Sequence, residues 1–309
     1  MKINNERGSK MENDKLILGS HVSMKAPKYL LGALEEALSY NANTFMFYTG
    51  APQNTIRKPT KALFIKEFTE KLIEKNININ NLIVHAPYII NLANSINKST
   101  YQLAVDFLRQ EIIRCQDIGI KTLVLHPGSA VGALPQTALD QIVKGLNAAC
   151  LEKQTVKIAL ETMSGKGSEV GTTFEQLQYI INNVKRPELI GVCWDTCHLS
   201  DAGYDLNNNL EQVIQQFDQL IGLDKLLVIH VNDSKNPINA HKDRHANLGM
   251  GYLGFQTLIN IIYHPLLLTK IKILETPWIN GHPPYLHEIK MIRTKKYNKE
   301  ILESLGTSK

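Results

Sequence analysis

The stretch GVCWDTCHLSD, residues 191–201, begins as a near-continuous apolar run and ends in Asp195, Cys197 and His198. Short runs of the same kind, rich in β-branched and aliphatic residues, recur along the chain. The eight runs are LILGSHV (16–22), NTFMFYT (43–49), NLIVHAP (81–87), TLVLHPG (122–128), KIALET (157–162), IGVCWDT (190–196), LLVIHVND (226–233) and KIKILETP (270–277). Unbroken apolar runs of this length are typical of parallel strands that are buried on both faces.

Segments with helical apolar spacing lie between most of these runs, for example residues 29–40 and 98–118. Eight strand–helix units in a chain of this length indicate a (β/α)8 TIM barrel. A doubly wound open sheet fits less well, because no Gly-rich phosphate loop follows the first run. We therefore predict one TIM-barrel catalytic domain over residues 15–309, preceded by a disordered polar tail over residues 1–14.

The composition places the chain among soluble globular proteins, with 43% apolar and 20% charged residues. No segment approaches the roughly 20 consecutive apolar residues of a membrane span, and the polar N-terminus lacks the apolar region of a secretory signal. The four cysteines form no close pair, which favours reduced thiols. These features predict a cytoplasmic protein that does not bind membranes. The net charge of +5 does not by itself identify a partner.

Potential metal ligands stand at the ends of six successive predicted strands. They are His85, His126, Glu161, Asp195, His230 and Glu275. A single histidine or acid after a strand is usually an ordinary hydrogen-bonded loop residue. Six in register are different, because the carboxyl ends of barrel strands converge on the face where active sites are built.

Two loops add further candidate ligands. His198 follows Asp195 by three residues, a spacing that can turn both side chains toward one site. Asp243 and His245 are separated by one residue, and in extended backbone their side chains point the same way.

Nine ligands exceed the needs of one ion. At three or four protein ligands each, they suit two or three ions, and imidazole with carboxylate favours Zn, Mn, Fe or Co. Polynuclear sites of this composition usually serve phosphoryl chemistry.

The ordered set of motifs closely resembles the endonuclease IV family, the zinc-dependent apurinic/apyrimidinic (AP) endonucleases of base excision repair. The motifs are LGSHVSM (18–24), FYTGAPQNT (47–55), VHAPY (84–88), LHPG (125–128), LET (160–162), WDTCH (194–198), HVND (230–233), KDRH (242–245) and LETP (274–277). Each motif is weak alone, but the ordered set is specific and extends from about residue 16 to residue 285.

The resemblance implies three zinc ions per chain, with manganese or iron as substitutes. The first ion would take His85, His126 and one oxygen of Glu161. The second would take the other oxygen of Glu161 with Asp195, His230 and Glu275, and the third would take His198, Asp243 and His245.

The implied reaction is hydrolysis of the phosphodiester 5′ to an abasic site in double-stranded DNA. It leaves a 3′-hydroxyl and a 5′-deoxyribose phosphate, and a 3′-phosphatase or 3′-phosphodiesterase side activity is expected. Glu161 is the implied catalytic residue, because it bridges two ions and orients the attacking hydroxide. The expected state is a monomer.

The resemblance also implies that the 50–54 loop and Tyr88 press into the minor groove while the abasic nucleotide is extruded. Some members of the family carry a basic inserting side chain in this loop. Here the loop reads GAPQN, so Gln53, with Asn54 beside it, has to act by bulk and hydrogen bonding.

Two other functions compete with this interpretation. A TIM-barrel sugar isomerase would use Glu161, Asp195, His230 and Glu275 to hold one or two divalent ions, but it gives no reason for the remaining histidines. A nucleic-acid-binding module without catalysis would have lost some of the nine ligands, and all nine are present.

Overall fold

The computed structural model describes residues 12–307 and contains a closed barrel of eight parallel strands. The order around the barrel is β1-β10-β7-β6-β5-β4-β3-β2, so each strand pairs with its neighbours along the chain and the first pairs with the last. The strands are Leu18–His21 (β1), Thr44–Phe47 (β2), Ile83–His85 (β3), Thr122–Leu125 (β4), Lys157–Glu161 (β5), Ile190–Asp195 (β6), Leu226–His230 (β7) and Ile271–Leu274 (β10). Each lies inside one of the eight predicted runs, and the predicted TIM barrel is confirmed.

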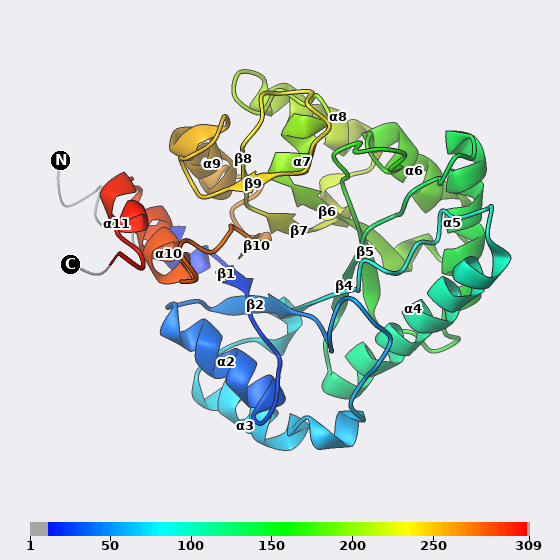
Figure 1. Cartoon of the computed structure of the whole chain (residues 1–309), viewed down its shortest axis with the longest axis horizontal. Helices are drawn as coiled ribbons and strands as arrows, with labels where there is room; N and C mark the ends of the chain where they lie inside the picture. Colours follow the sequence, from blue (N-terminus) through cyan, green and yellow to red (C-terminus); the bar gives the residue numbers. More distant parts are fainter. Residues whose placement is uncertain (1–11, 308–309) are drawn as a thin grey trace.

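Helices surround the barrel in a ring (Figure 1). The α-helices are Tyr29–Ser39 (α2), Ile65–Glu74 (α3), Lys98–Ile118 (α4), Pro135–Ala149 (α5), Phe174–Asn183 (α6), Thr196–Asp201 (α7), Leu210–Leu220 (α8), Gly254–Tyr263 (α9), Tyr285–Thr294 (α10) and Lys299–Glu303 (α11). Short 3₁₀ helices occupy Thr60–Ala62, Ile79–Asn81, Pro187–Leu189 and Leu223–Lys225. Among residues 12–307, no helix has both the length and the apolar content needed to cross a membrane.

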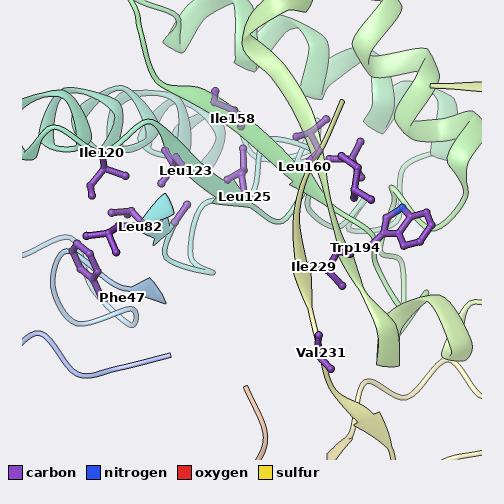
Figure 2. Close-up of a cluster of buried hydrophobic side chains, with 14 of the residues drawn as sticks. Phe47, Leu82, Ile120, Leu123, Leu125, Ile158, Leu160, Trp194, Ile229 and Val231 are labelled. Atoms are coloured by element: carbon purple, nitrogen blue, oxygen red, sulfur yellow. The ribbon is translucent and has the colours of Figure 1, made fainter. Parts of the chain in front are cut away.

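Alternate residues of the strands pack in two separate cores. Side chains such as Phe47, Leu123, Leu160 and Trp194 point outward toward the helices (Figure 2). The residues between them, including Cys193, fill the interior of the barrel. Because the strands are largely buried on both faces, most of their residues are apolar and do not alternate with polar ones, and several of the exceptions are the polar residues at the carboxyl ends.

The chain begins to pack against the barrel earlier than expected. Residues 1–11 of the predicted tail lie outside the described part of the structure. Residues 12–15 form a turn of helix, and the side chain of Asn13 bonds to the hydroxyl of Tyr263 at 2.8 Å and to the carbonyl of Arg293 at 3.1 Å. Residues 12–14 are therefore attached to the barrel rather than part of a solvated tail.

Candidate metal centre

The nine candidate ligands come together at the carboxyl ends of the strands. His85, Glu161, Asp195 and His230 are the last residues of β3, β5, β6 and β7. His126 and Glu275 directly follow β4 and β10, while the other three ligands stand on α7 and on the segment after β7. Several overlapping groups of these side chains have ligand atoms within 4.8 Å of one another. The ring predicted from the sequence is therefore present as a spatial cluster.

Glu161 lies at the centre of the cluster and is almost fully buried. Its Oε2 lies 3.1 Å from Nε2 of His85 and 3.2 Å from Nε2 of His126. Its Oε1 faces a different pair, at 3.2 Å from Nδ1 of His230 and 3.3 Å from Nδ1 of His198. The two oxygens of this carboxylate thus face two separate pairs of histidines.

Main-chain carbonyls orient three of the histidines. Nδ1 of His85 donates to the carbonyl of Ala86 at 2.7 Å, and Nδ1 of His198 donates to that of Thr162 at 2.9 Å. Nδ1 of His245 lies 3.3 Å from the carbonyl of Glu275. A hydrogen bond donated by Nδ1 leaves Nε2 as the ring atom that can coordinate an ion, which is the usual arrangement of a metal-binding histidine.

The carboxylates of β6 and β10 approach His230, which is completely buried. Nδ1 of His230 lies 3.0 Å from Oε2 of Glu275 and 4.0 Å from Oδ2 of Asp195. Together with Glu161, these residues form a four-member group of potential ligands.

A third group forms where α7 and a loop meet. Nε2 of His198 lies 3.0 Å from Oδ1 of Asp243, and the same oxygen lies 3.8 Å from Nε2 of His245. Asp195 caps the N-terminus of α7, since its Oδ1 accepts from the main-chain N–H of His198 at 2.8 Å. This cap fixes the spacing that brings His198 back toward the strand end.

Asp243 and His245 meet by a different route from the one predicted. Asp243 is not in extended backbone, because its φ of 54° places it in the left-handed region. His245 belongs to a short antiparallel pair, Asp233–Ser234 (β8) with His245–Ala246 (β9), which folds the segment over the barrel. The two side chains therefore converge through a bend and a hairpin rather than along one strand.

Polar side chains outside the nine hold this arrangement in place. Asn232 donates from Nδ2 to Oδ2 of Asp195 at 2.6 Å and accepts from the N–H of Glu275 at 3.0 Å. Asp201, also buried, accepts from the N–H groups of Lys242 at 3.0 Å and Asp243 at 2.7 Å. Sequence reasoning missed Asp201, because its partners lie about 40 residues further along the chain.

The charged groups of the cluster strongly shift one another's pKa values. Burial alone lowers the pKa of His198, but Asp195 and Asp243 outweigh burial and hold that pKa well above its ordinary value. Burial alone raises the pKa of Glu161, and its histidine neighbours reverse this and hold the pKa well below the ordinary value. The carboxylates thus create a negative potential that favours cations at this position.

The donor set fits divalent metal ions. Nε2 of His230 and Nε2 of His245 are buried and have no hydrogen-bond partner among the described residues. Buried polar atoms are rarely left without a partner in a folded protein. Nε2 of His245 lies 3.6 Å from Oδ2 of Asp195 and 3.8 Å from Oδ1 of Asp243, so an ion between these atoms would satisfy it. In His230 the atom that faces the carboxylates is Nδ1. Cys193 also lies within ligand distance of Glu161 and His230, but burial raises the pKa of its thiol to about 12. It therefore stays protonated, as expected for a packing residue.

A cavity of about 390 Å³ opens beside the cluster. It is lined in part by His126, Tyr88, Lys166 and Asp243. Tyr88 is 52% exposed, and Nζ of Lys166 forms an ion pair with Asp243 at 3.0 Å. The cavity can therefore admit a polar group beside the third set of ligands, and Lys166 is a cation there that the sequence analysis did not single out.

A second hollow lies between the end of β1 and the loop after β2. It is lined by His21, Tyr48 and residues 50–52, and the ring of Tyr48 lies 5.3 Å from that of His85. Gln53 and Asn54 stand exposed on the same loop. Burial lowers the pKa of His21 to about 4, so its imidazole is neutral. His21 thus lies beside the centre and outside the nine candidate ligands.

Comparison with known proteins assigns the chain to a family. A family profile described as "Xylose isomerase-like TIM barrel" matches residues 34–295. "Probable endonuclease 4" of Mesoplasma florum is 51% identical over 93% of this chain and 99% of the relative. The protein of the same name from Geobacillus kaustophilus is 52% identical over 94% of this chain and 98% of its own length. The chain belongs to the endonuclease IV family.

The structure agrees with this assignment. Endonuclease IV from Thermus thermophilus superposes with a TM-score of 0.76 at 26% identity, covering 90% of this chain and 97% of that protein. A D-tagatose 3-epimerase-like protein superposes with a TM-score of 0.64 at 19% identity, which shows a shared barrel fold only. As a member of the endonuclease IV family, the chain is a hydrolase of the AP endonuclease type.

Proposed function

We propose that the chain is a DNA-repair enzyme that cleaves the phosphodiester 5′ to an abasic site in duplex DNA and uses three zinc ions. The observation that carries the proposal is Glu161, whose two oxygens face separate pairs of histidines at 3.1 to 3.3 Å. A bridging carboxylate of this kind suits a site that holds adjacent ions. A sugar isomerase would leave His85, His126 and His198 without a role.

Each ion would be held by one of the three groups. The first would take His85, His126 and Glu161, and the second would take Glu161, Asp195, His230 and Glu275. The third would take His198, Asp243 and His245. When bound, such ions supply Lewis acidity, which lowers the pKa of water and offsets negative charge on the phosphate and the departing 3′ oxygen.

The side chains of the chain contribute orientation. Glu161 is buried and ionised, so it can accept a hydrogen bond from the attacking nucleophile and align it with the phosphorus. Lys166 stands at the cavity, where its ammonium can pair with a phosphate oxygen. Tyr88 and the 50–54 loop would contact the DNA around the extruded sugar, with Gln53 and Asn54 at the exposed surface.

Cleavage of a duplex that contains a single abasic site tests the proposal. The expected products carry a 3′-hydroxyl, which a DNA polymerase can extend, and a 5′-deoxyribose phosphate. Elemental analysis is expected to find three zinc ions per chain. The same centre would release phosphate from a 3′-phosphate end, and the protein would sediment as a monomer. Intact duplex after long incubation, or conversion of a ketose to an aldose instead, would refute the assignment.

Glu161→Gln tests the role of the bridge. The amide keeps the shape of the side chain but loses the charge, so cleavage is expected to fall by about 100-fold or more, in line with the loss of a group that orients the nucleophile. Binding to abasic DNA is expected to persist, because the surface that contacts DNA is unchanged. A variant that retains half of the parental rate would contradict the bridging role.

A further inference from the structure

The loop after β2 is almost entirely exposed. The side chains of Gln53, Asn54 and Thr55 are exposed, and that of Ile56 is 79% exposed. A loop without buried side chains has little to fix its backbone, and ordering it on contact with a partner costs conformational entropy. Its shape must therefore be set by other contacts.

The guanidinium of Arg57 provides these contacts from below. Its Nη1 donates to three carbonyls of the loop, those of Ala51 at 3.2 Å, Asn54 at 3.0 Å and Ile56 at 2.9 Å. One guanidinium thus holds the backbone of residues 51–56 by three hydrogen bonds.

Arg57 is itself held by helix α4. Its Nε bonds to Oε1 of Glu111 at 2.7 Å, and the side chains of this pair are 1% and 0% exposed. The guanidinium also lies 4.7 Å from the centre of the Phe107 ring, in a cation–π contact. A buried pair of this kind fixes geometry more than it adds stability.

A second arginine, Arg114 of α4, holds the two ends of the loop by hydrogen bonds. Nη1 of Arg114 donates to the carbonyl of Lys58 at 2.6 Å, and Nη2 donates to that of Thr49 at 3.1 Å. The hydroxyl of Thr49 donates in turn to Oε2 of Glu111 at 2.6 Å. The loop is therefore fixed at both ends and from beneath.

Gly50 gives the guanidinium room. A Cβ at this position would lie 2.8 Å from Cδ and from Nη1 of Arg57. A larger residue would have to displace the arginine from its carbonyl partners, although it would not remove any buried charge.

We propose that Arg57, anchored by Glu111, is a positioning residue that pre-forms the 51–56 loop for abasic DNA. The inference rests on the proposed function, because it assumes that this loop contacts the DNA. With the loop already in shape, Gln53 and Asn54 reach the DNA without a further cost of ordering the backbone. Loss of the clamp then weakens recognition and extrusion of the abasic nucleotide and leaves the metal centre intact.

The test compares the parental protein with Arg57→Met/Glu111→Gln, which leaves no unpaired charge from this ion pair, and with Gly50→Ala. Both are expected to raise KM for an abasic duplex by about tenfold, the scale of one lost set of ordering contacts. The zinc content is expected to stay at the parental value, whereas kcat is expected to fall in proportion to the fraction of bound duplex in which the abasic nucleotide is extruded. Lys71→Ala, which removes an exposed cation on α3, is the control for charge alone and is expected to keep the parental KM.

A spectroscopic measurement separates positioning from simple stability. The base 2-aminopurine, placed opposite the abasic site, becomes fluorescent when it loses its stacking partners. The parental protein is expected to raise this signal, and both clamp variants are expected to reduce the rise at saturating protein. Arg57→Lys keeps the charge but not the fork of donors, so it is expected to behave like the clamp variants.

The outcomes distinguish failure of the clamp from failure of the proposed function. If the parental protein does not cleave abasic duplex, the proposed function fails. If it cleaves, and Gly50→Ala and the double variant both show parental KM and fluorescence, the clamp is wrong while the proposed function stands. Parental behaviour of Arg57→Lys would likewise overturn the role assigned to the planar donor group.

Discussion

Asn232 connects two of the proposed ligands, so replacing it tests whether the surrounding hydrogen bonds set the affinity for metal. The residue is fully buried, and its side-chain amide bonds to Asp195 at 2.6 Å and to the N–H of Glu275 at 3.0 Å. Asn232→Leu keeps the number of side-chain heavy atoms and the branching, so it removes both bonds without opening a cavity.

The size of the effect follows from these two bonds. Each buried group that loses its partner costs about 1–3 kcal/mol. The oxygen of Asp195 can still coordinate an ion, whereas the N–H of Glu275 is left without an acceptor. Loss of such a supporting hydrogen bond typically lowers metal affinity by about 10–100-fold. We expect a decrease of that size for the ion held by Asp195, His230 and Glu275.

Competition with a chromogenic zinc chelator measures this affinity directly. Asn236→Leu is a matched control, because Nδ2 of Asn236 is buried but has no hydrogen-bond partner among the described residues. It is expected to retain the parental affinity. If Asn232→Leu releases zinc no more readily than the parental protein, the hydrogen bonds to Asp195 and Glu275 do not tune the site.

Three further changes test other parts of the structure. Asp201→Ala removes the acceptor that holds the N–H of Asp243, so elemental analysis is expected to find one zinc ion fewer than in the parental protein; a full complement would contradict this. Burial lowers the pKa of Lys272 to about 7 from 10.5, so the folded state binds fewer protons than the unfolded state in this window and stability rises with pH across it. Lys272→Met is expected to abolish that rise in urea denaturation, and an identical slope would refute it. Burial raises the pKa of Glu288 from 4.5 to about 7, so its contribution to stability is complete below pH 4.5 and is lost as pH rises to about 7. Glu288→Gln is expected to flatten the fall in thermal stability between pH 4.5 and about 7. If the fall is unchanged, the carboxyl of Glu288 is not its cause.

The strands and their terminal ligands could be predicted because one repeated pattern encodes both. A run buried on both faces, followed at once by His85 or Glu161, indicates a strand end on the catalytic face without any knowledge of its neighbours. The pattern of residues 98–118 likewise predicted α4 with its bounds, and its apolar residues Phe107 and Ile112 are buried. Leu103 had the same apolar character but is 53% exposed, since spacing alone does not say where the apolar face ends.

Features that depend on contacts distant in sequence were not predictable. The hairpin of β8 and β9 uses two residues on each side, which is too short to show a period. The N–H of Asp243, whose backbone is left-handed, donates to the carboxylate of Asp201. No residue near Asp243 in the sequence predicts this conformation. Lys272 has the sequence character of a surface residue, yet it is fully buried and its ammonium donates to the carbonyls of Leu267 and Leu268.

The nine ligands are carried by two kinds of backbone. His85, Glu161, Asp195 and His230 end strands that are paired on both sides within the barrel, so these ligands can leave their positions only when the barrel opens. Asp243 stands in a loop held by hydrogen bonds from its own and a neighbouring N–H to a single carboxylate, and such a segment opens locally at a much smaller cost. If three ions bind as proposed, we therefore expect them to differ in lifetime. The ion held through the loop would exchange on the timescale of loop motion, and the ions held through the strand ends would exchange more slowly.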